Sequence, residues 1–324
     1  MLHTTRSIRR SLTALTLAAC MTPLSAAAAD APAIRVGLVC GGMTPMVAQT
    51  AINDGSFDRG GVRVEKVCFP GGAPAVQALV GRSIDVFIGS FEHVLRQRAR
   101  GLEVKAYAEL YDGMSYELVA KSGSPVRGLA DLKGQTLAIT APSSLSETAL
   151  RIGLDDVHLN PDRDVQIVPA GSGATMVAAI DTNRVGAGML TEPSIAQLTS
   201  EGKYRVVWSP ETPYAANVVM ASEAWVAQNR PGFTKFLAVM RDEHDRIARN
   251  PSSAVAAMRK DFPQVSAPIM LRAIEHELPH IPAGLHVSSR GTQSVLAIEL
   301  KQGNLKAPVA VAASVDDALL SSAR

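Results

Sequence analysis

Cysteine, aromatic residues and excess charge are all scarce in this chain. Three cysteines and 4% aromatic residues among 324 are too few for a small disulfide scaffold. The 32 basic residues include three, Arg6, Arg9 and Arg10, in the first 29 positions, so the remainder has 29 basic against 30 acidic residues, a net charge of −1. Without a basic excess or a Lys/Arg-rich run interleaved with aromatics, nucleic-acid binding lacks its electrostatic basis.

Long apolar runs are missing except at the N-terminus. Three arginines precede an apolar stretch over residues 12–24, which is too short to span a bilayer, and Ser25-Ala26-Ala27-Ala28-Ala29 offers a small-residue cleavage site. We therefore expect residues 1–29 to be a signal peptide and the mature chain to be periplasmic. In an alternative interpretation, Leu17-Ala18-Ala19-Cys20 is a lipoprotein box with Cys20 as the lipidated residue.

The usual signatures of enzymes are also lacking. The chain has no G-x-S-x-G elbow, no Walker or dinucleotide glycine pattern after a strand, and no cysteine with a histidine partner in a known local signature. We therefore expect a protein that is not an enzyme and holds no cofactor.

One metalloprotease-like motif is present but has the wrong backbone chemistry. His276-Glu277-Leu278-Pro279-His280 matches H-E-x-x-H, whose function requires both histidines on one face of an unbroken helix. Pro279 lacks the amide hydrogen and disfavours a helical conformation at Leu278. The sequence therefore predicts a helix end with solvated or capping histidines, and no metal site.

The most informative feature is a pattern that occurs twice, about a hundred residues apart. Phe69-Pro70-Gly71-Gly72 is followed by an apolar helical run, by Ile84-Asp85-Val86-Phe87-Ile88-Gly89-Ser90 and by Glu92. Val168-Pro169-Ala170-Gly171 is followed by a similar run, by Val185-Gly186-Ala187-Gly188-Met189 and by Glu192. A duplicated βαβ lobe would gather polar atoms at one edge of each parallel sheet, and two such edges facing each other would form a clamp.

The periodicity predicts an α/β protein of two lobes. Strands are expected at 34–40, 62–69, 84–90, 104–110, 136–140, 165–169, 185–190 and 205–208, and helices at 44–53, 73–81, 91–100, 144–153, 173–182 and 194–200. Extended stretches at 116–121 and 214–220 would cross between the lobes as a two-strand hinge. Lobe I would then comprise 31–112 plus 218–324, with a helical C-terminal tail, and lobe II 113–217. The tail is expected to be helical from Glu223 onward, with helices that begin at Pro231, at Pro251 and, last, at Ser288.

Small or hydroxylated residues follow several predicted strands, at helix starts. Their free backbone amides could hold an anionic or acceptor group without a formal cation, although ordinary helix capping would use the same residue types. These candidates are Gly42, Thr44, Gly72, Ser143, Ser144, Gly171 and Ser172.

Two glutamates complicate the charge of the expected ligand. Glu92 and Glu192 occupy corresponding ends of the repeated units, where they would favour a donor or cationic group, or else simply begin helices near the positive end of the dipole. Phe69 and Phe91, with Tyr116 and Tyr214, could line the apolar part of the pocket or belong to the core.

Two cysteines, Cys40 and Cys68, fall at the ends of the first two predicted strands. These strands would be neighbours, so in an oxidising compartment the thiols could form a disulfide, or else both could be buried as small apolar residues. Two cysteines without nearby histidines make a metal site improbable.

The pattern resembles the nitrate/sulfonate/taurine-type substrate-binding proteins of ABC importers, a family that includes binders of thiamine-pyrimidine precursors. The resemblance covers nearly all of the chain after the leader. It is carried by Ile34-Arg35-Val36-Gly37, Phe69-Pro70-Gly71-Gly72, Gly81-Arg82-Ser83-Ile84-Asp85-Val86, Asp131-Leu132-Lys133-Gly134-Gln135-Thr136, Val168-Pro169 and Thr191-Glu192-Pro193. The chain departs from the family pattern at Asn183-Arg184-Val185-Gly186-Ala187, where an aspartate is replaced.

The resemblance implies a type II periplasmic binding fold, a monomer that closes over a small ligand and then docks on a membrane permease. The ligand would be a sulfonate, another small anion or a pyrimidine-like molecule. By matching position, the implied ligand shell is Gly42, Thr44, Gly72, Ser90, Ser143, Ser144, Gly171 and Glu192. The alternatives are an enzyme acting on a small substrate in the same cleft and a ligand sensor for a receptor kinase.

Overall fold

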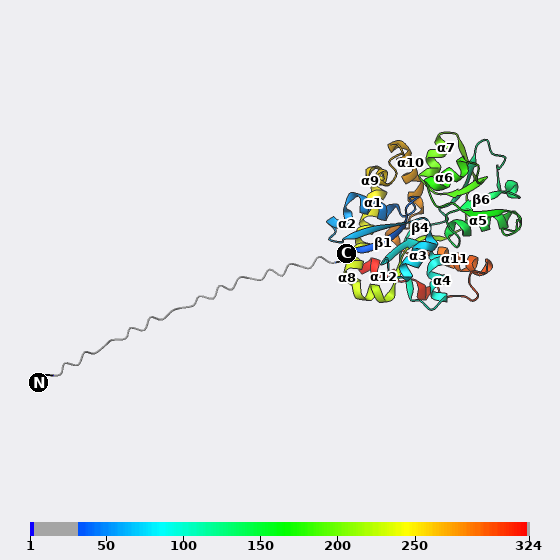
Figure 1. Ribbon diagram of the computed structural model, residues 1–324. Helices are drawn as coiled ribbons and strands as arrows, with labels where there is room; N and C mark the ends of the chain where they lie inside the picture. Colours follow the sequence, from blue (N-terminus) through cyan, green and yellow to red (C-terminus); the bar gives the residue numbers. More distant parts are fainter. Residues whose placement is uncertain (3–31, 323–324) are drawn as a thin grey trace. The chain divides into compact units, whose positions relative to one another are not determined.

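Two five-stranded sheets form the framework of the protein. The computed structural model describes residues 1–2 and 32–322, so nearly all of the predicted signal peptide and its alternative at Cys20 lie outside the described residues. From Ala33 onward the chain forms one compact unit (Figure 1). Among the described residues, no helix has both the length and the apolar character that a membrane span requires.

The first sheet has the strand order β2-β1-β3-β10-β4, and we call it, with its helices, lobe I. Its strands and helices before the hinge are β1 (Ile34–Val39), α1 (Met46–Asp54), α2 (Ser56–Arg59), β2 (Val64–Phe69), α3 (Gly72–Val80), β3 (Val86–Gly89), α4 (Phe91–Ala99) and β4 (Val104–Asp112).

The second sheet has the order β7-β6-β8-β5-β9, and we call it, with its helices, lobe II. Its elements are β5 (Glu117–Lys121), β6 (Thr136–Ile139), α5 (Leu145–Asp156), β7 (Gln166–Pro169), α6 (Ala174–Asp181), β8 (Ala187–Leu190), α7 (Ser194–Ser200) and β9 (Tyr204–Trp208). The chain returns to lobe I through β10 (Ala215–Ser222).

The two sheets share one topology. In each, three parallel strands are followed by one antiparallel strand that arrives from the other half of the chain, β10 in lobe I and β5 in lobe II. Each strand and helix predicted between 34 and 208 is present, with ends within three residues of the expected positions. The duplicated α/β arrangement is therefore confirmed, whereas the exact lobe boundaries remain a prediction.

The C-terminal third adds helices, chiefly to lobe I (Figure 1). They are α8 (Glu223–Arg249), α9 (Val255–Asp261), α10 (Ala267–Glu277), α11 (Ser289–Lys301) and α12 (Ala318–Ser322). The tail is helical from Glu223, and non-helical angles at Asn229 divide α8 just before Pro231, where a helix start was expected. Ser288 does cap α11 through its side chain, but α11 is not the last helix.

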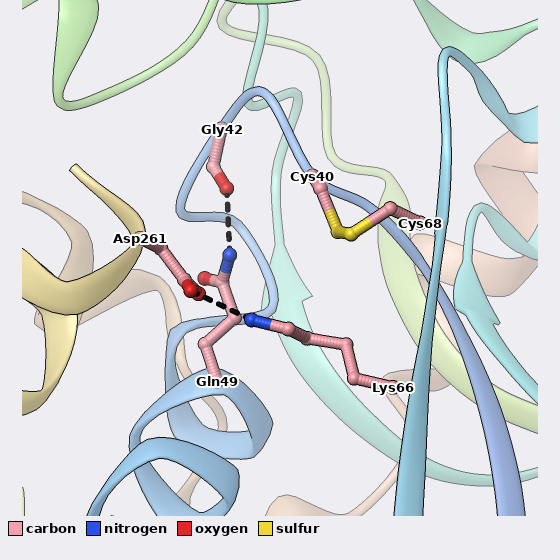
Figure 2. The surroundings of a disulfide bond; sticks show 6 residues. All are labelled: Cys40, Gly42, Gln49, Lys66, Cys68 and Asp261. Carbon is pink, nitrogen blue, oxygen red and sulfur yellow. Dashed lines mark hydrogen bonds and ion pairs between the residues drawn. A yellow bond between two sulfur atoms is a disulfide. The ribbon is translucent and has the colours of Figure 1, made fainter.

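A disulfide joins Cys40 and Cys68 (Figure 2), so the thiols are not free. Cys68 lies in β2 opposite Leu38 of β1, and the two cysteine Cα atoms are 5.3 Å apart. That separation is typical of disulfides, and it arises because neighbouring strands bring their ends together. The bridge fixes the end of β1 immediately before Gly41 and Gly42.

Candidate functional site

A cavity lies where the carboxyl ends of the parallel strands of both lobes face each other. The cavity itself measures about 50 Å³, and the space between its walls reaches about 600 Å³ when the open solvent at its mouth is counted. Clefts at this position, outside the carboxyl ends of the strands, are the usual ligand sites of open α/β sheets. The residues that line it are Val39, Gly42, Thr44, Pro45, Gly72, Phe87, Ile88, Gly89, Ser90, His93, Ser115, Tyr116, Thr140, Ser144, Leu145, Ser172, Gly173, Met189, Leu190, Thr191, Ala216 and Asn217.

Half of the predicted ligand residues line this interlobe cavity and half do not. Those that line it are Gly42, Thr44, Gly72, Ser90, Ser144 and Ser172. The residues placed elsewhere are Phe69, Phe91, Glu92, Ser143, Gly171 and Glu192. Phe91 is fully buried in the core, Ser143 lies in a separate groove, and Gly171 has the positive φ of +73° that suits a turn.

The helix starts that were expected to bind a ligand instead bring the lobes into contact. The amide of Ala73 donates to Ser144 Oγ at 3.0 Å, and the amide of Met43 donates to the carbonyl of Glu192 at 2.8 Å. A Cβ on Gly42 would lie 2.0 Å from Thr191 Oγ1 of lobe II. The backbone amides of Ala73 and Met43 therefore already donate to acceptors in lobe II, and Gly42 permits a close approach of the lobes.

Four polar residues that line the cavity have a buried side-chain atom without a hydrogen-bond partner within the described part of the chain. These atoms are Ser90 Oγ, His93 Nε2, Ser115 Oγ and Asn217 Oδ1. Buried polar atoms are nearly always paired, so unpaired ones that share a cavity indicate a place for a ligand or water. The sequence interpretation named Ser90 but missed His93, Ser115 and Asn217, because each of these is an isolated residue without a motif.

His93 is uncharged at physiological pH. Burial lowers the pKa of His93 to about 3, and the nearby Arg96 guanidinium contributes to the lowering. The imidazole can therefore offer one donor and one acceptor nitrogen to a ligand, but no positive charge.

Glu92 lies behind His93 and joins the lobes. Its carboxylate accepts from Thr148 Oγ1 of lobe II at 2.9 Å and from the hydroxyl of Tyr214, beside the hinge strand β10, at 2.5 Å. Arg96 lies 3.8 Å away, forms a bidentate ion pair with Glu299 and donates to the carbonyl of Ser143 in lobe II at 2.6 Å. Glu92 is completely buried in this network, so it does not face the cavity as expected.

Glu192 lies beside a second cavity, on the other side of the hinge. We call it the hinge cavity, and its lining residues are Tyr111, Met114, Ser115, Glu117, Glu192, Ile195, Ser209, Pro210, His276, Glu277 and His280. Burial raises the pKa of Glu192 to about 7, and the nearby carboxylates of Glu277 and Glu117 also raise it. The hydrogen bond from the Ala196 amide and the charge of His276 act in the opposite direction and lower it. Within residues 32–322, only Ser115 lines both cavities.

The metalloprotease-like motif ends a helix, as Pro279 predicted. Helix α10 stops at Glu277, and 278–280 continue as a single 3-10 turn. The ring centroids of His276 and His280 are 6.1 Å apart and tilted by 49°. His276 is half exposed, but Glu277 is buried, so the expectation of a merely solvated helix end missed its contact with the hinge cavity.

Comparison with known proteins identifies the family. The model of the family described as "NMT1/THI5 like" matches residues 44–254. The chain belongs to this family. A protein of Brucella abortus (strain 2308), described only as a binding protein, is 26% identical over 254 residues, which are 76% of each chain. The riboflavin-binding protein RibY of Chloroflexus aurantiacus is 33% identical over 165 residues, 50% of this chain and 46% of its own length.

Solved structures establish the fold. The alkanesulfonate-binding protein SsuA from Xanthomonas axonopodis pv. citri, bound to MOPS, has a TM-score of 0.72 at 21% identity and covers 88% of this chain and 98% of its own. The periplasmic nitrate-binding protein NrtA from Synechocystis PCC 6803 has a TM-score of 0.72 at 15% identity, over 90% and 88% of the two chains. The NMT1/THI5-like chain thus has the periplasmic binding protein fold.

Proposed function

We propose that the protein is an extracytoplasmic solute receptor that captures a small organic ligand between its lobes and delivers it to an ABC permease. The observation that carries the proposal is the interlobe cavity with four unpaired polar side chains, Ser90, His93, Ser115 and Asn217. Family membership and the fold of sulfonate- and nitrate-binding proteins support it. Closure over the ligand requires differential contacts with the closed state and no catalysis.

The lining favours an uncharged polar ligand. Among its described residues there is no Lys, Arg, Asp or Glu, and His93 is neutral. An anion buried here without a cation would depend on hydroxyl, amide and imidazole donors alone. Two of the backbone amides, those of Ala73 and Met43, already donate to lobe II and are not available to it. We therefore rank a pyrimidine-like or other neutral ligand above a sulfonate or nitrate.

A thermal-shift panel of pyrimidines, aromatic acids, carboxylates, sulfonates and nitrate tests the proposal. A ligand present at 100 times its dissociation constant stabilises the folded state by about 2.7 kcal/mol, which raises the melting temperature measurably. We expect a neutral heterocycle to give the largest shift. A larger shift with a sulfonate or nitrate would reverse the ranking, and measurable turnover of any compound would argue for an enzyme instead.

Export is the second part of the proposal. We propose cleavage after Ala29 and residence in the periplasm, with lipidation of Cys20 as the alternative. Intact-mass analysis of the secreted protein distinguishes the two, because a chain that begins at Asp30 and a diacylated chain that begins at Cys20 differ in mass.

A further inference from the structure

The hinge cavity brings together acidic groups from both lobes. Glu192 follows β8 in lobe II, Glu117 begins β5 at the hinge, and Glu277 ends α10 on the lobe I side. Helix α10 contacts α7 of lobe II, so this wall of the cavity is an interlobe contact. Opening of the lobes would separate Glu192 from Glu277.

The carboxylates in this cavity are incompletely satisfied. Glu192 Oε2 accepts from the amide of Ala196 at 2.9 Å, and Glu117 Oε1 accepts from Ser209 Oγ at 2.7 Å. Glu277 is 3% exposed, and its Oε2 has no hydrogen-bond partner within residues 32–322. A buried carboxylate in this situation is costly when ionised.

The positive charge that faces these carboxylates is limited. His276 Nδ1 lies 3.7 Å from Glu277 Oε1, and the Glu277 carboxylate, with Glu192 and Glu117, raises the pKa of His276 to about 9. The ring of His280 stacks on Tyr111 and its Nδ1 lies 3.3 Å from the carbonyl of Asp112. Three carboxylates therefore share the cavity with one imidazolium and the ring of His280.

We propose that closure of the lobes binds a proton at Glu192, so that the closed state of the receptor, and with it solute capture, is favoured at acidic pH. This inference rests on the proposed function, since it requires lobes that open and close around a solute. It concerns the hinge cavity alone and assigns no new role to the interlobe cavity.

The direction of the pH dependence follows from linkage. Glu192 has a pKa near 7 with the lobes together, against 4.5 for a solvated glutamate. A carboxyl group whose pKa is higher in the closed state than in the open state stabilises the closed state fully at pH values below its ordinary pKa. This stabilisation is lost as the pH rises through the raised pKa. Burial of Glu277 raises its pKa in the same direction. Closure should therefore become less favourable between pH 5 and pH 8.

Small-angle X-ray scattering of the ligand-free protein at pH 5.5, 6.5, 7.5 and 8.5 measures the ratio of closed to open molecules. We expect this ratio to be roughly tenfold or more higher at pH 5.5 than at pH 8.5. In Glu192→Gln, which keeps an oxygen to accept from the Ala196 amide, the ratio should change much less with pH, because only Glu277 and His276 still titrate in the cavity. Glu201→Gln is the matched control, because Glu201 lies just after α7, is 40% exposed and pairs with Lys203.

Carbon-13 NMR of the glutamate carboxyls provides a direct second readout. We expect the Glu192 resonance to titrate above pH 6 in the closed protein, and Glu277→Gln to lower that midpoint. A closed-to-open ratio that is equal at pH 5.5 and 8.5, or a Glu192→Gln protein that titrates like the wild type, would overturn the inference. A ligand found in the thermal-shift panel would still support the receptor function in that case.

Discussion

Asn217 shows how a single residue comes to line the interlobe cavity without belonging to a motif. It is the third residue of β10, in a stretch whose pairing with β4 shifts register on both sides of it. Such irregularities re-aim side chains, and here Asn217 is 4% exposed, lines the interlobe cavity and has an unpaired amide oxygen. The strand could be predicted from its sequence, but the irregularity and the orientation of this side chain could not.

Asn217→Ala should weaken ligand binding without destabilising the ligand-free protein. A hydrogen bond lost to a ligand inside a cavity costs about 1 kcal/mol, or roughly fivefold in affinity, whereas in the free protein the substitution removes a polar atom that has no partner. Isothermal titration and thermal melting measure the two effects. Asn229→Ala, outside the cavity, serves as the control. A lower melting temperature with unchanged affinity would remove Asn217 from the site.

The two lobes also differ at the residue level. Asp85 in lobe I accepts from the amide and the guanidinium of Arg35 on the neighbouring strand. The register of the paired strands places Gly186 at the corresponding position of lobe II, which is the departure noted in the sequence. A Cβ on Gly186 would lie 2.6 Å from Gln135 Oε1, so the side chain of Gln135 occupies this space instead.

Elements were predicted well where the chain is periodic. Each βαβ unit alternates short β-rich runs with helical ones, and both copies have the same order, so each copy supports the prediction of the other. The tail has no repeat to guide it, which explains why α12 was missed. Contacts between the lobes, such as the amide of Met43 with Glu192, depend on tertiary structure that no local pattern encodes.

The disulfide acts at the level of secondary-structure elements, because it joins the ends of two strands. Its cysteines are separated by 28 residues, and closing a loop of that length in the unfolded chain stabilises a protein by about 3 kcal/mol. We expect the Cys40→Ala, Cys68→Ala double variant to melt several degrees lower and to bind ligand more weakly, since the loop with Gly42 begins beside the bridge. Melting with and without a reductant gives the same comparison in the wild type. An unchanged melting temperature would show that the strands need no covalent tie.

At the scale of the whole molecule, closure is held by contacts on both sides of the hinge. The hinge cavity occupies one side. On the other side Arg96 donates to Ser143, Glu92 accepts from Thr148, and the side-chain amide of Gln302 donates to the carbonyl of Thr148 at 3.3 Å. These interactions join α4 and α11 of lobe I to α5 of lobe II, and an open protein would lose them. The free energy of closure is therefore set partly by residues that touch no ligand.

Thr148→Val tests this coupling, because valine has the shape of threonine but cannot donate to Glu92. The substitution leaves the Glu92 carboxylate with Tyr214 and Arg96 but without a lobe II donor. Hydrogen bonds to charged groups contribute about 1.5–3 kcal/mol, so the closed state should weaken and ligand affinity should fall at least roughly tenfold. The change should appear mainly as faster dissociation, since the cavity itself is intact.

Thr182→Val is the matched control for this prediction. Thr182 also lies in lobe II, but its hydroxyl donates only to the carbonyls of Ala178 and Ala179 within the same lobe. Stopped-flow kinetics and scattering of both variants separate loss of closure from loss of folding. If Thr148→Val binds and closes like Thr182→Val, then the buried carboxylate stabilises lobe I alone, and the contacts of α5 with lobe I are a consequence of closure rather than a cause of it.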